Sequence, residues 1–346
     1  MAEDKNKSNT YPPSELRRDL ISGDWVVIAM GRGKRPGSGL FKRASDPAYE
    51  KKEGCPFENL EASGNPPPIF ALTKSEASSS SDWFVQVIPN KYPAFGGTAR
   101  GMKEKVGPFE VKDGTGFHEV IITRDHNRTI AQFSQDETIL LLRAYRMRYH
   151  LLSHQEDVKY ISIFHNYGRE AGASLFHPHS QLMAIPVVPP DVARSFHGSL
   201  RYFENHGRCV HCDLLAWERK EKIRVIYENS YFVALCPFVS HTAFEVRIFP
   251  KSHESSFEEI GEEELADAAD ILHESLHRLW GGLGDPAYNF FIHTSPAGTS
   301  TYYPHYHWHI EILPKTGTPA GFEISTGIDI STITPEVAAD ALRKVV

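Results

Sequence analysis

Two stretches of the chain carry apolar side chains at the three- and four-residue spacing of an amphipathic helix. The first, between Leu140 and Leu152, follows Ser134 and Glu137, which stand at the first and fourth positions of a helix capping box. The second, between Leu265 and Leu279, follows the acidic residues 262–264. We therefore predict one long helix in each half of the chain.

The segments that flank these helices also repeat. Four positions recur with a constant offset of 128 residues: Tyr160 and Tyr288, His165 and His293, His177 and His305, Pro186 and Pro314. Each copy has the pattern of strands, a long helix, a strand, a loop and a strand that bears histidines. This order favours an α+β fold with mainly antiparallel sheets. A repeat of this length predicts two tandem copies of one domain, related by internal duplication.

The repeat also sets the expected domain boundaries. We predict a disordered leader over residues 1–13, an N-terminal domain over 14–190 and a C-terminal domain over 191–346. The proline-rich segment that begins at Pro186 and continues to Ser199 is the expected join. Residues 37–54 and 74–82, rich in small and polar side chains, are expected to be loops.

Composition narrows the classes of function. The chain of 346 residues has a net charge of −7, which argues against a nucleic acid as partner. No apolar run approaches the roughly 18 residues that span a bilayer, so no membrane association is expected. Four cysteines are too few for a disulfide scaffold of this length and indicate a reducing compartment. We therefore expect a cytoplasmic protein.

The strongest chemical signal lies between Asn166 and Gln181. Glycines and small residues, Gly172, Ala173 and Ser174 among them, allow backbone amides to approach an anion closely. A strand with a period of two would then present His177, His179 and Gln181 on one face. A neutral imidazole can attack phosphorus, and the Gln181 amide can donate to phosphoryl oxygens. A polar sheet face with surface histidines is the alternative interpretation.

A second signal is the pair Cys209 and Cys212, because a Cys-x-x-Cys knuckle places two thiolates for tetrahedral zinc. Two more ligands are needed. His253 and one histidine of the run 305, 307 and 309 are the natural supply. A redox role for the two cysteines is the rival interpretation, but no thioredoxin-like context surrounds them.

These motifs resemble the galactose-1-phosphate uridylyltransferase family of the histidine-triad superfamily, which includes relatives of the ADP-glucose phosphorylase type. The family's active-site run is Asn-x-Gly, then Gly-Ala-Ser, then His-Pro-His-x-Gln, and this chain matches it. The resemblance extends along nearly the whole chain through further segments: the opening strand at residues 15–27, the basic turn at 32–36, the Asn motif at 90–94 and the segment at 321–323.

The resemblance implies a role for each matching residue. His179 is the expected nucleophile that becomes nucleotidylated, and Gln181 assists it. The expected substrate-binding residues hold the phosphates, lie near the phosphorylated substrate or close over the sugar: Asn166, Gly172, Ala173, Ser174, Arg32, Lys34, Arg35, Asn90, Gly321, Phe322 and Glu323. The resemblance also favours His307 as the fourth ligand beside Cys209, Cys212 and His253.

The duplication suggests a matching metal site in the first half. Cys55, His126 and His177 would be three of its ligands, and relatives often have a second cysteine three residues after the first. Here Glu58 stands at that position. A carboxylate can ligate zinc, so the four residues form a chemically possible set. Loss of the metal from this half is the alternative.

The resulting functional hypothesis is a ping-pong nucleotidyltransferase that acts on nucleotide sugars through a nucleotidyl-His179 intermediate. Its expected partners are a nucleotide sugar and a hexose 1-phosphate or phosphate, and zinc is the expected metal. The first hypothesis is transfer of uridylyl from UDP-glucose to galactose 1-phosphate. The alternatives are an ADP-glucose phosphorylase or adenylyltransferase, and a zinc-stabilised nucleotide-binding protein without turnover. A homodimer is expected.

Overall fold

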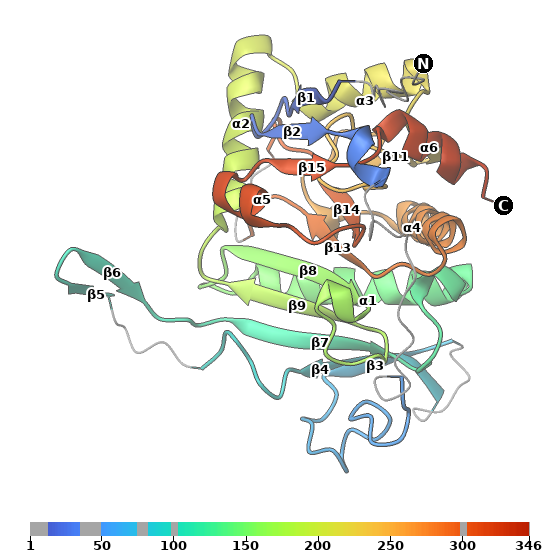
Figure 1. Ribbon diagram of the computed structural model, residues 1–346. Coiled ribbons are helices and arrows are strands. Elements are labelled where there is room, and N and C mark those ends of the chain that lie inside the picture. Colours follow the sequence, from blue (N-terminus) through green and yellow to red (C-terminus); the bar gives the residue numbers. More distant parts are fainter. Residues whose placement is uncertain (1–12, 35–49, 75–81, 98–102, 298–302, 346) are drawn as a thin grey trace, which may run out of the picture.

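The computed structural model describes residues 13–34, 50–74, 82–97, 103–297 and 303–345, and a single antiparallel sheet of ten strands runs through it (Figure 1). In spatial order its strands are β10 (Val225–Glu228), β11 (Phe232–Leu235), β12 (Val246–Pro250), β14 (His309–Pro314), β13 (Tyr288–His293), β8 (Tyr160–Tyr167), β9 (His179–Ile185), β7 (Phe117–Thr123), β4 (Trp83–Pro89) and β3 (Phe70–Thr73). The predicted α+β class with a mainly antiparallel sheet is confirmed.

The sheet has two halves with the same internal order. Read from its outer edges inwards, β3-β4-β7-β9-β8 mirrors β10-β11-β12-β14-β13, and this order fits the predicted duplication. The halves meet where β8 pairs with β13, with Asn166 opposite Asn289 and Tyr167 opposite Tyr288. Backbone hydrogen bonds therefore continue across the centre without a break, and the two halves share one sheet.

Both predicted long helices are present. Helix α1 (Gln135–Ser153) begins at the predicted capping box, in which Ser134 accepts from the Glu137 amide and Glu137 accepts from the Ser134 amide. Helix α4 (Glu262–Leu283) begins after Gly261, whose amide donates to Glu264. Helix α1 packs against β4 and β8, helix α4 against β10 and β11, and the helices pack against each other. Their apolar stripes thus join one hydrophobic core that spans both halves.

A smaller sheet lies over the second half of the molecule. It contains β1 (Glu15–Arg18), β2 (Trp25–Ile28) and β15 (Asp329–Ser331), and Figure 1 shows it on the side away from β3 and β4. Arg17 ties β1 to the second half, because its guanidinium donates to Glu336 at 3.0 Å and to the Phe238 carbonyl at 3.1 Å. The N-terminal strands of the expected first domain therefore rest on the expected second domain, and the domain boundaries remain a prediction.

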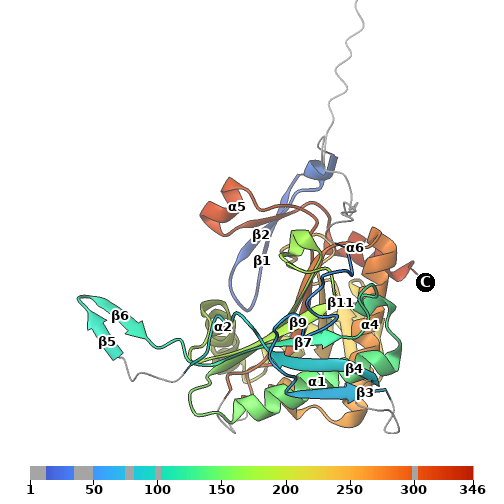
Figure 2. The ribbon, with the colours of Figure 1, turned by 90° about the horizontal axis from the view of Figure 1, so that it is seen from below.

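The remaining elements surround the two sheets. They are α2 (Pro190–His206), α3 (Val210–Glu221), α5 (Gly321–Thr326), α6 (Pro335–Arg343), the short 3₁₀ turns η1 (Met30–Lys34), η3 (Ile130–Gln132), η4 (Arg169–Ala171) and η5 (Phe257–Glu259), and a hairpin of β5 (Lys103–Val106) and β6 (Phe109–Lys112). The hairpin extends away from the body of the molecule (Figure 2).

Two sequence-based expectations need correction. The segment expected to join the domains, 186–199, is not a linker throughout, because α2 begins at Pro190 and Ser199 is buried within it. Proline is favoured at the first position of a helix, where its missing amide proton is not needed. In addition, β9 begins at His179 and β14 at His309, so His177, His305 and His307 precede the strands that were expected to carry them.

Several expectations fall on residues that the structure does not describe. The leader lies almost wholly outside the described residues, as do most of the expected loops at 37–54 and 74–82. Over the described part of the chain, no helix combines the length and the apolar character that crossing a membrane requires.

The contact between α2 and the turn that follows β1 predicts a sensitive glycine. A Cβ atom at Gly198 would lie 1.8 Å from the Ile21 carbonyl oxygen. We expect Gly198→Ala to destabilise the protein by about 1–3 kcal/mol, as overpacking does, although alanine is the better helix former. Thermal unfolding of Gly198→Ala checks this, with Gly317→Ala as the control, since no atom lies within 4 Å of that site. Equal melting temperatures for the two variants would contradict the contact.

Candidate active site and metal centres

His179 and Gln181, at the start of β9, open onto a cavity of about 390 Å³ in the first half of the molecule. Apolar side chains from three segments form part of its wall, among them Phe57, Ile88 and Val120. The polar residues that complete the lining are Ser63, Asn65, Asn90, Lys91 and Ser174. Of the residues predicted from the sequence, this cavity brings together His179, Gln181, Asn90 and Ser174.

The His179 ring is held in one tautomer. Its Nδ1 donates to the His177 carbonyl at 2.8 Å, so Nε2 carries the lone pair. Burial lowers the pKa of His179, which keeps the ring neutral near pH 7, while the hydrogen bond to His177 acts in the opposite direction. The Phe57 ring packs against it edge-on, with the centroids 5.2 Å apart. The result is a neutral, oriented imidazole that lines the cavity, as nucleophilic attack on phosphorus requires.

The loop before β9 differs in detail from the expectation. The amides of Ala171, Gly172 and Ala173 donate to the carbonyls of Gly168 and Arg169, so they close the turn on itself. Anion binding by Gly172 and Ala173 remains a prediction. Gly168 has a φ of 84°, and a Cβ there would lie 2.6 Å from the Ala287 Cβ. The glycine is required because the second half of the molecule packs closely against this turn. The loop presents Ser174 to the cavity.

A residue of the second half holds this loop. Asn289 on β13 donates through Nδ2 to Asn166 Oδ1 and to the Ala171 carbonyl, both at 2.8 Å. Asn166 therefore turns its amide oxygen towards β13. The sequence analysis missed Asn289, because its closeness to Asn166 follows from the pairing of β8 with β13, which lie more than 120 residues apart.

The sequence analysis also missed His118. It lies on β7, is 8% exposed, and its Nε2 is 2.8 Å from Gln181 Oε1. The alternation along β7 contained a signal, because His118 shares a face with Val120, which lines the cavity. A buried histidine that shares a strand face with a residue of the cavity wall is thus a candidate for a functional role.

Four other predicted substrate-binding residues that the structure describes are not among the residues that line this cavity. Arg32 lies in η1, and Gly321, Phe322 and Glu323 lie in α5, beside the smaller sheet (Figure 1). Arg35 and the side chain of Lys34 lie outside the described part of the structure. Substrate binding by these residues remains a prediction.

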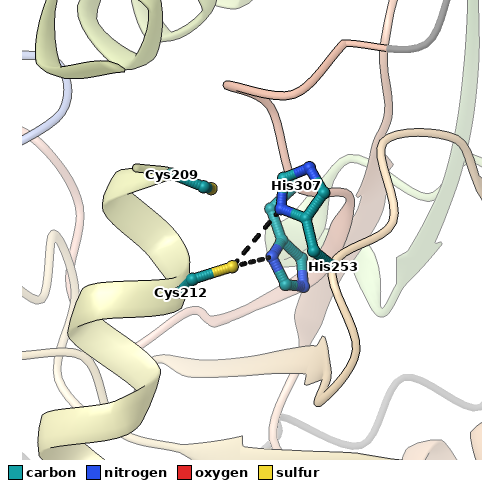
Figure 3. A group of neighbouring side chains, drawn as sticks. All are labelled: Cys209, Cys212, His253 and His307. Atoms are coloured by element: carbon teal, nitrogen blue, oxygen red, sulfur yellow. Dashed lines mark hydrogen bonds between the residues drawn. The ribbon is translucent and has the colours of Figure 1, made fainter. Parts of the chain in front are cut away.

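The four predicted ligands of the second half meet at one point. Cys209 and Cys212 lie at the start of α3, and Figure 3 shows the Cys212 sulfur directed at His253 and His307. Cys212 Sγ is 3.3 Å from His253 Nδ1 and 3.7 Å from His307 Nδ1. Ligands of a tetrahedral zinc, bound at about 2.0–2.3 Å, lie roughly 3.3–3.8 Å apart. His307 Nε2 donates to the Pro250 carbonyl, so its Nδ1 lone pair points at the thiols.

The predicted ligands of the first half also converge. His177 Nδ1 is 3.2 Å from His126 Nδ1 and 3.6 Å from Cys55 Sγ, and Glu58 Oε1 lies 3.3 Å from His126 Nδ1 and 3.4 Å from His177 Nδ1. His177 Nε2 donates to the Thr123 carbonyl, and His126 Nε2 donates to the Glu50 carbonyl. Burial lowers the pKa of His177 to about 4, so the ring is neutral near pH 7. Because Nε2 carries the proton, Nδ1 carries a lone pair.

The consequence is an unfavourable contact that a cation would relieve. Glu58 Oε1 is buried and has no hydrogen-bond donor among the described residues, while it faces two imidazole lone pairs. A negatively charged oxygen among lone pairs is costly unless a positive ion lies between them. The donor set of one thiol, two imidazoles and one carboxylate fits a divalent metal such as zinc.

The two metal centres correct the offset of the repeat. His177 donates to the carbonyl of Thr123 and His307 to that of Pro250, and in each half another ligand, His126 or His253, follows three residues after that carbonyl. His177 is therefore equivalent to His307, 130 residues later, and not to His305. His126 and His177 are 51 residues apart and His253 and His307 are 54, so the second half has three more residues before β14 than the first has before β9, which the constant offset of 128 conceals.

This register makes His309 the equivalent of His179 and Glu311 that of Gln181. His309 Nδ1 donates to the His307 carbonyl at 3.1 Å, as His179 does to His177. Its Nε2, however, lies 3.3 Å from Glu311 Oε1. Glu311 also pairs with Arg247 at 3.1 Å, and the charge of Arg247 keeps the pKa of Glu311 well below its usual value despite burial. A carboxylate at this position repels phosphate, so the second half lacks the chemistry of the first.

An oriented histidine at the start of a sheet strand, a glutamine two residues later and two clusters of Cys and His side chains are typical of a histidine-triad type of site. In agreement, a family profile described as "Galactose-1-phosphate uridyl transferase, N-terminal domain" matches residues 5–189, and one described as a domain of unknown function, DUF4921, matches residues 110–346. The chain is 34% identical to ADP-glucose phosphorylase of Arabidopsis thaliana over 335 residues, which cover 96% of this chain and 93% of the relative.

Two further comparisons agree. The crystal structure of the Arabidopsis thaliana ADP-glucose phosphorylase with bound ADP-glucose superposes with a TM-score of 0.81 at 33% identity, covering 96% of this chain and all of that one. Galactose-1-phosphate uridylyltransferase of Thermotoga maritima is 28% identical over 341 residues, 95% of this chain and 98% of the relative. The chain belongs to the galactose-1-phosphate uridylyltransferase family, a family of nucleotidyltransferases.

The contacts of Asn289 predict that the second half stiffens the active-site loop. Asn289→Ala removes both hydrogen bonds, each worth about 1 kcal/mol. We expect amide hydrogen exchange within residues 168–174 to quicken by about tenfold or more. Exchange measured by mass spectrometry checks this, with the exposed Asn205→Ala as the control. Unchanged exchange in Asn289→Ala would show that the turn is held by its own hydrogen bonds.

Proposed function

We propose that this chain transfers a nucleoside monophosphate from a nucleotide sugar to a phosphate acceptor in two steps through His179. The observation that carries the proposal is the His179 ring itself, neutral, held through Nδ1 and exposed to a cavity through Nε2. In the first step Nε2 attacks the α-phosphorus, the α–β phosphoanhydride bond breaks, and the hexose 1-phosphate leaves with the electron pair.

In the second step an oxygen of the acceptor phosphate attacks the same phosphorus, the P–N bond breaks, and the electron pair returns to Nε2. The Gln181 amide and the Ser174 hydroxyl, which line the cavity with His179, are placed to stabilise the phosphoryl oxygens. With phosphate as acceptor the product is a nucleoside diphosphate, and with a hexose 1-phosphate it is a new nucleotide sugar.

ADP-glucose with phosphate is the first substrate pair we propose. The similarity to the Arabidopsis thaliana ADP-glucose phosphorylase supports it, both in sequence, at 34% identity, and in structure, with a TM-score of 0.81. UDP-glucose with galactose 1-phosphate is the second candidate. The 28% identity to the Thermotoga maritima galactose-1-phosphate uridylyltransferase over nearly the full length supports that pair.

We further propose zinc in both metal centres. Bound zinc would connect the segments that carry its ligands, and it would not take part in the making or breaking of bonds. In the first half Cys55, Glu58, His126 and His177 would hold it, and in the second half Cys209, Cys212, His253 and His307. Because the His177 carbonyl accepts from His179 Nδ1, a fixed His177 also fixes the nucleophile. The hydrogen bond from the Cys212 thiol lowers the pKa of Cys209, although burial acts in the opposite direction, and this favours the thiolate that a metal binds.

The covalent step predicts labelling of one histidine. We expect the wild-type chain, incubated with ADP-glucose or UDP-glucose labelled at the α-phosphorus, to retain acid-labile label, because phosphoramidates hydrolyse in acid. His179→Asn should retain none and lose at least about 10³-fold in turnover, as loss of a nucleophile does. The matched control is His309→Asn, which removes the equivalent ring in the second half and should still take up label.

The same assay compares the two substrate pairs. Faster turnover with ADP-glucose and phosphate supports the first pair, and faster turnover with UDP-glucose and galactose 1-phosphate supports the second. If His179→Asn is labelled like the wild type, His179 is not the nucleophile. Binding of nucleotide with no label and no turnover would instead indicate a zinc-stabilised nucleotide-binding protein.

The metal centres predict stoichiometries for single variants. We expect two zinc ions per wild-type chain purified without chelator and one per chain in Glu58→Ala. The loss should slow turnover, since misplacement of a catalytic group by about 1 Å can cost roughly 10²-fold. Glu58→Cys should restore the metal, because thiolate is a common zinc ligand. Elemental analysis beside initial rates measures both effects.

A matched variant tests the other centre. Cys209→Ser should also lower the stoichiometry to one, but its main effect should be on the melting temperature, because its centre lies in the second half, away from His179. A zinc content in Glu58→Ala equal to that of the wild type would show that Glu58 is not a ligand.

A further inference from the structure

His118 makes two directed contacts, one through each ring nitrogen. Nδ1 lies 3.1 Å from the Ala94 amide nitrogen, and Nε2 lies 2.8 Å from Gln181 Oε1. The ring is 8% exposed and comes from β7, the strand that pairs with β9. It therefore connects the segment after β4 to the glutamine that follows the nucleophile.

The backbone determines the tautomer of this ring. The Ala94 amide can only donate, so His118 Nδ1 accepts, and a neutral ring then carries its proton on Nε2. Asn90 Nδ2 also lies 3.0 Å from Nε2, but Asn90 Oδ1 accepts from the Tyr92 amide, which leaves Nδ2 as the donor end. Two donors cannot satisfy each other, so Gln181 Oε1 is the acceptor for His118 Nε2–H.

The consequence concerns the amide of Gln181. An amide side chain has one acceptor end and one donor end, and a free glutamine can present either. Because His118 takes the oxygen, the NH₂ group is the end left for the cavity that His179 lines. A phosphoryl group offers only acceptors, so the flipped amide would turn an oxygen towards negative charge and repel it.

We propose that His118 is a positioning residue that sets the orientation of the Gln181 amide for phosphoryl transfer. It acts through Gln181 and does not touch the reacting atoms. The inference deepens the proposed function and rests on it for its kinetic part. His118 then affects mainly the stability of the transition state, because the charge on the phosphoryl oxygens is greatest there. Its effect on the binding of the nucleotide sugar is smaller.

Two substitutions separate the contacts of the ring. In His118→Asn the side-chain oxygen can replace Nδ1 as acceptor for the Ala94 amide, but no donor reaches Gln181. In His118→Gln the longer side chain can place an NH₂ group near the former Nε2 and so keep the donor. We expect His118→Asn to lower kcat about tenfold or more with little change in KM, and His118→Gln to recover most of kcat.

A double-mutant cycle tests whether the effect passes through Gln181. In a Gln181→Ala background, His118→Asn should cause no further loss of kcat, because its target is gone. A full additional loss there, or equal kcat values for His118→Asn and the wild type, would overturn the proposal. Melting temperatures of all variants serve as the check on folding. The proposal would also be overturned if His118→Gln did not restore kcat and if the loss of kcat followed the loss of melting temperature.

A spectroscopic measurement is independent of turnover. Long-range ¹⁵N–¹H spectra of the ¹⁵N-histidine-labelled full chain distinguish the two neutral tautomers, and comparison with His118→Asn assigns the signals of His118. We expect a proton on Nε2 and none on Nδ1 near neutral pH. A proton on Nδ1 would overturn the inference, whatever the activity is. Absence of label and turnover in the wild type, together with the expected tautomer, would reject the proposed function and keep the assigned hydrogen bond.

Discussion

The peptide group of His177 is the constraint on which the active site depends. Its carbonyl accepts from His179 Nδ1, while the side chain of the same residue donates to the Thr123 carbonyl and directs Nδ1 at Cys55, Glu58 and His126. One residue therefore connects the cluster of candidate ligands to the His179 ring. Because His179 lies two residues after His177 and its Nδ1 donates to the His177 carbonyl, any rotation of His177 would be transmitted to that ring.

The two halves of the molecule use the same framework for different purposes. In both, a strand that starts with histidine follows a ligand histidine whose Nε2 donates to a backbone carbonyl. They differ two residues later, where Gln181 in the first half corresponds to Glu311 in the second. An amide can donate to a phosphate, whereas the carboxylate of Glu311 is committed to Arg247 and faces His309. The two halves therefore differ in charge at this position.

The second half nevertheless contributes to the candidate site of the first. The pairing of β8 with β13 lets Asn289 hold Asn166 and the turn before β9, and Ala287 packs so closely on that turn that Gly168 is required. Such contacts explain why the two copies share one sheet and one core. The position of the turn before β9 is therefore set partly by the second half of the molecule.

Local patterns in the sequence determined the elements and the chemistry of this protein. The capping box at Ser134, the apolar stripes of α1 and α4, the run from Asn166 to Gln181 and the cysteine knuckle all depend on neighbours within a few residues, and the structure contains each of them. Each ligand motif likewise specifies its own donor atoms, whereas their convergence from distant segments depends on the fold.

Only the tertiary structure decided the relations between distant segments. The equivalence of His177 with His307, the contact of Asn289 with Asn166 and the hydrogen bond from His118 to Gln181 all follow from strand pairing between residues far apart in the sequence. Three additional residues before β14 change the register without leaving a local signal. Register is set by backbone pairing and core packing across the whole sheet, so it becomes visible only when the chain is folded.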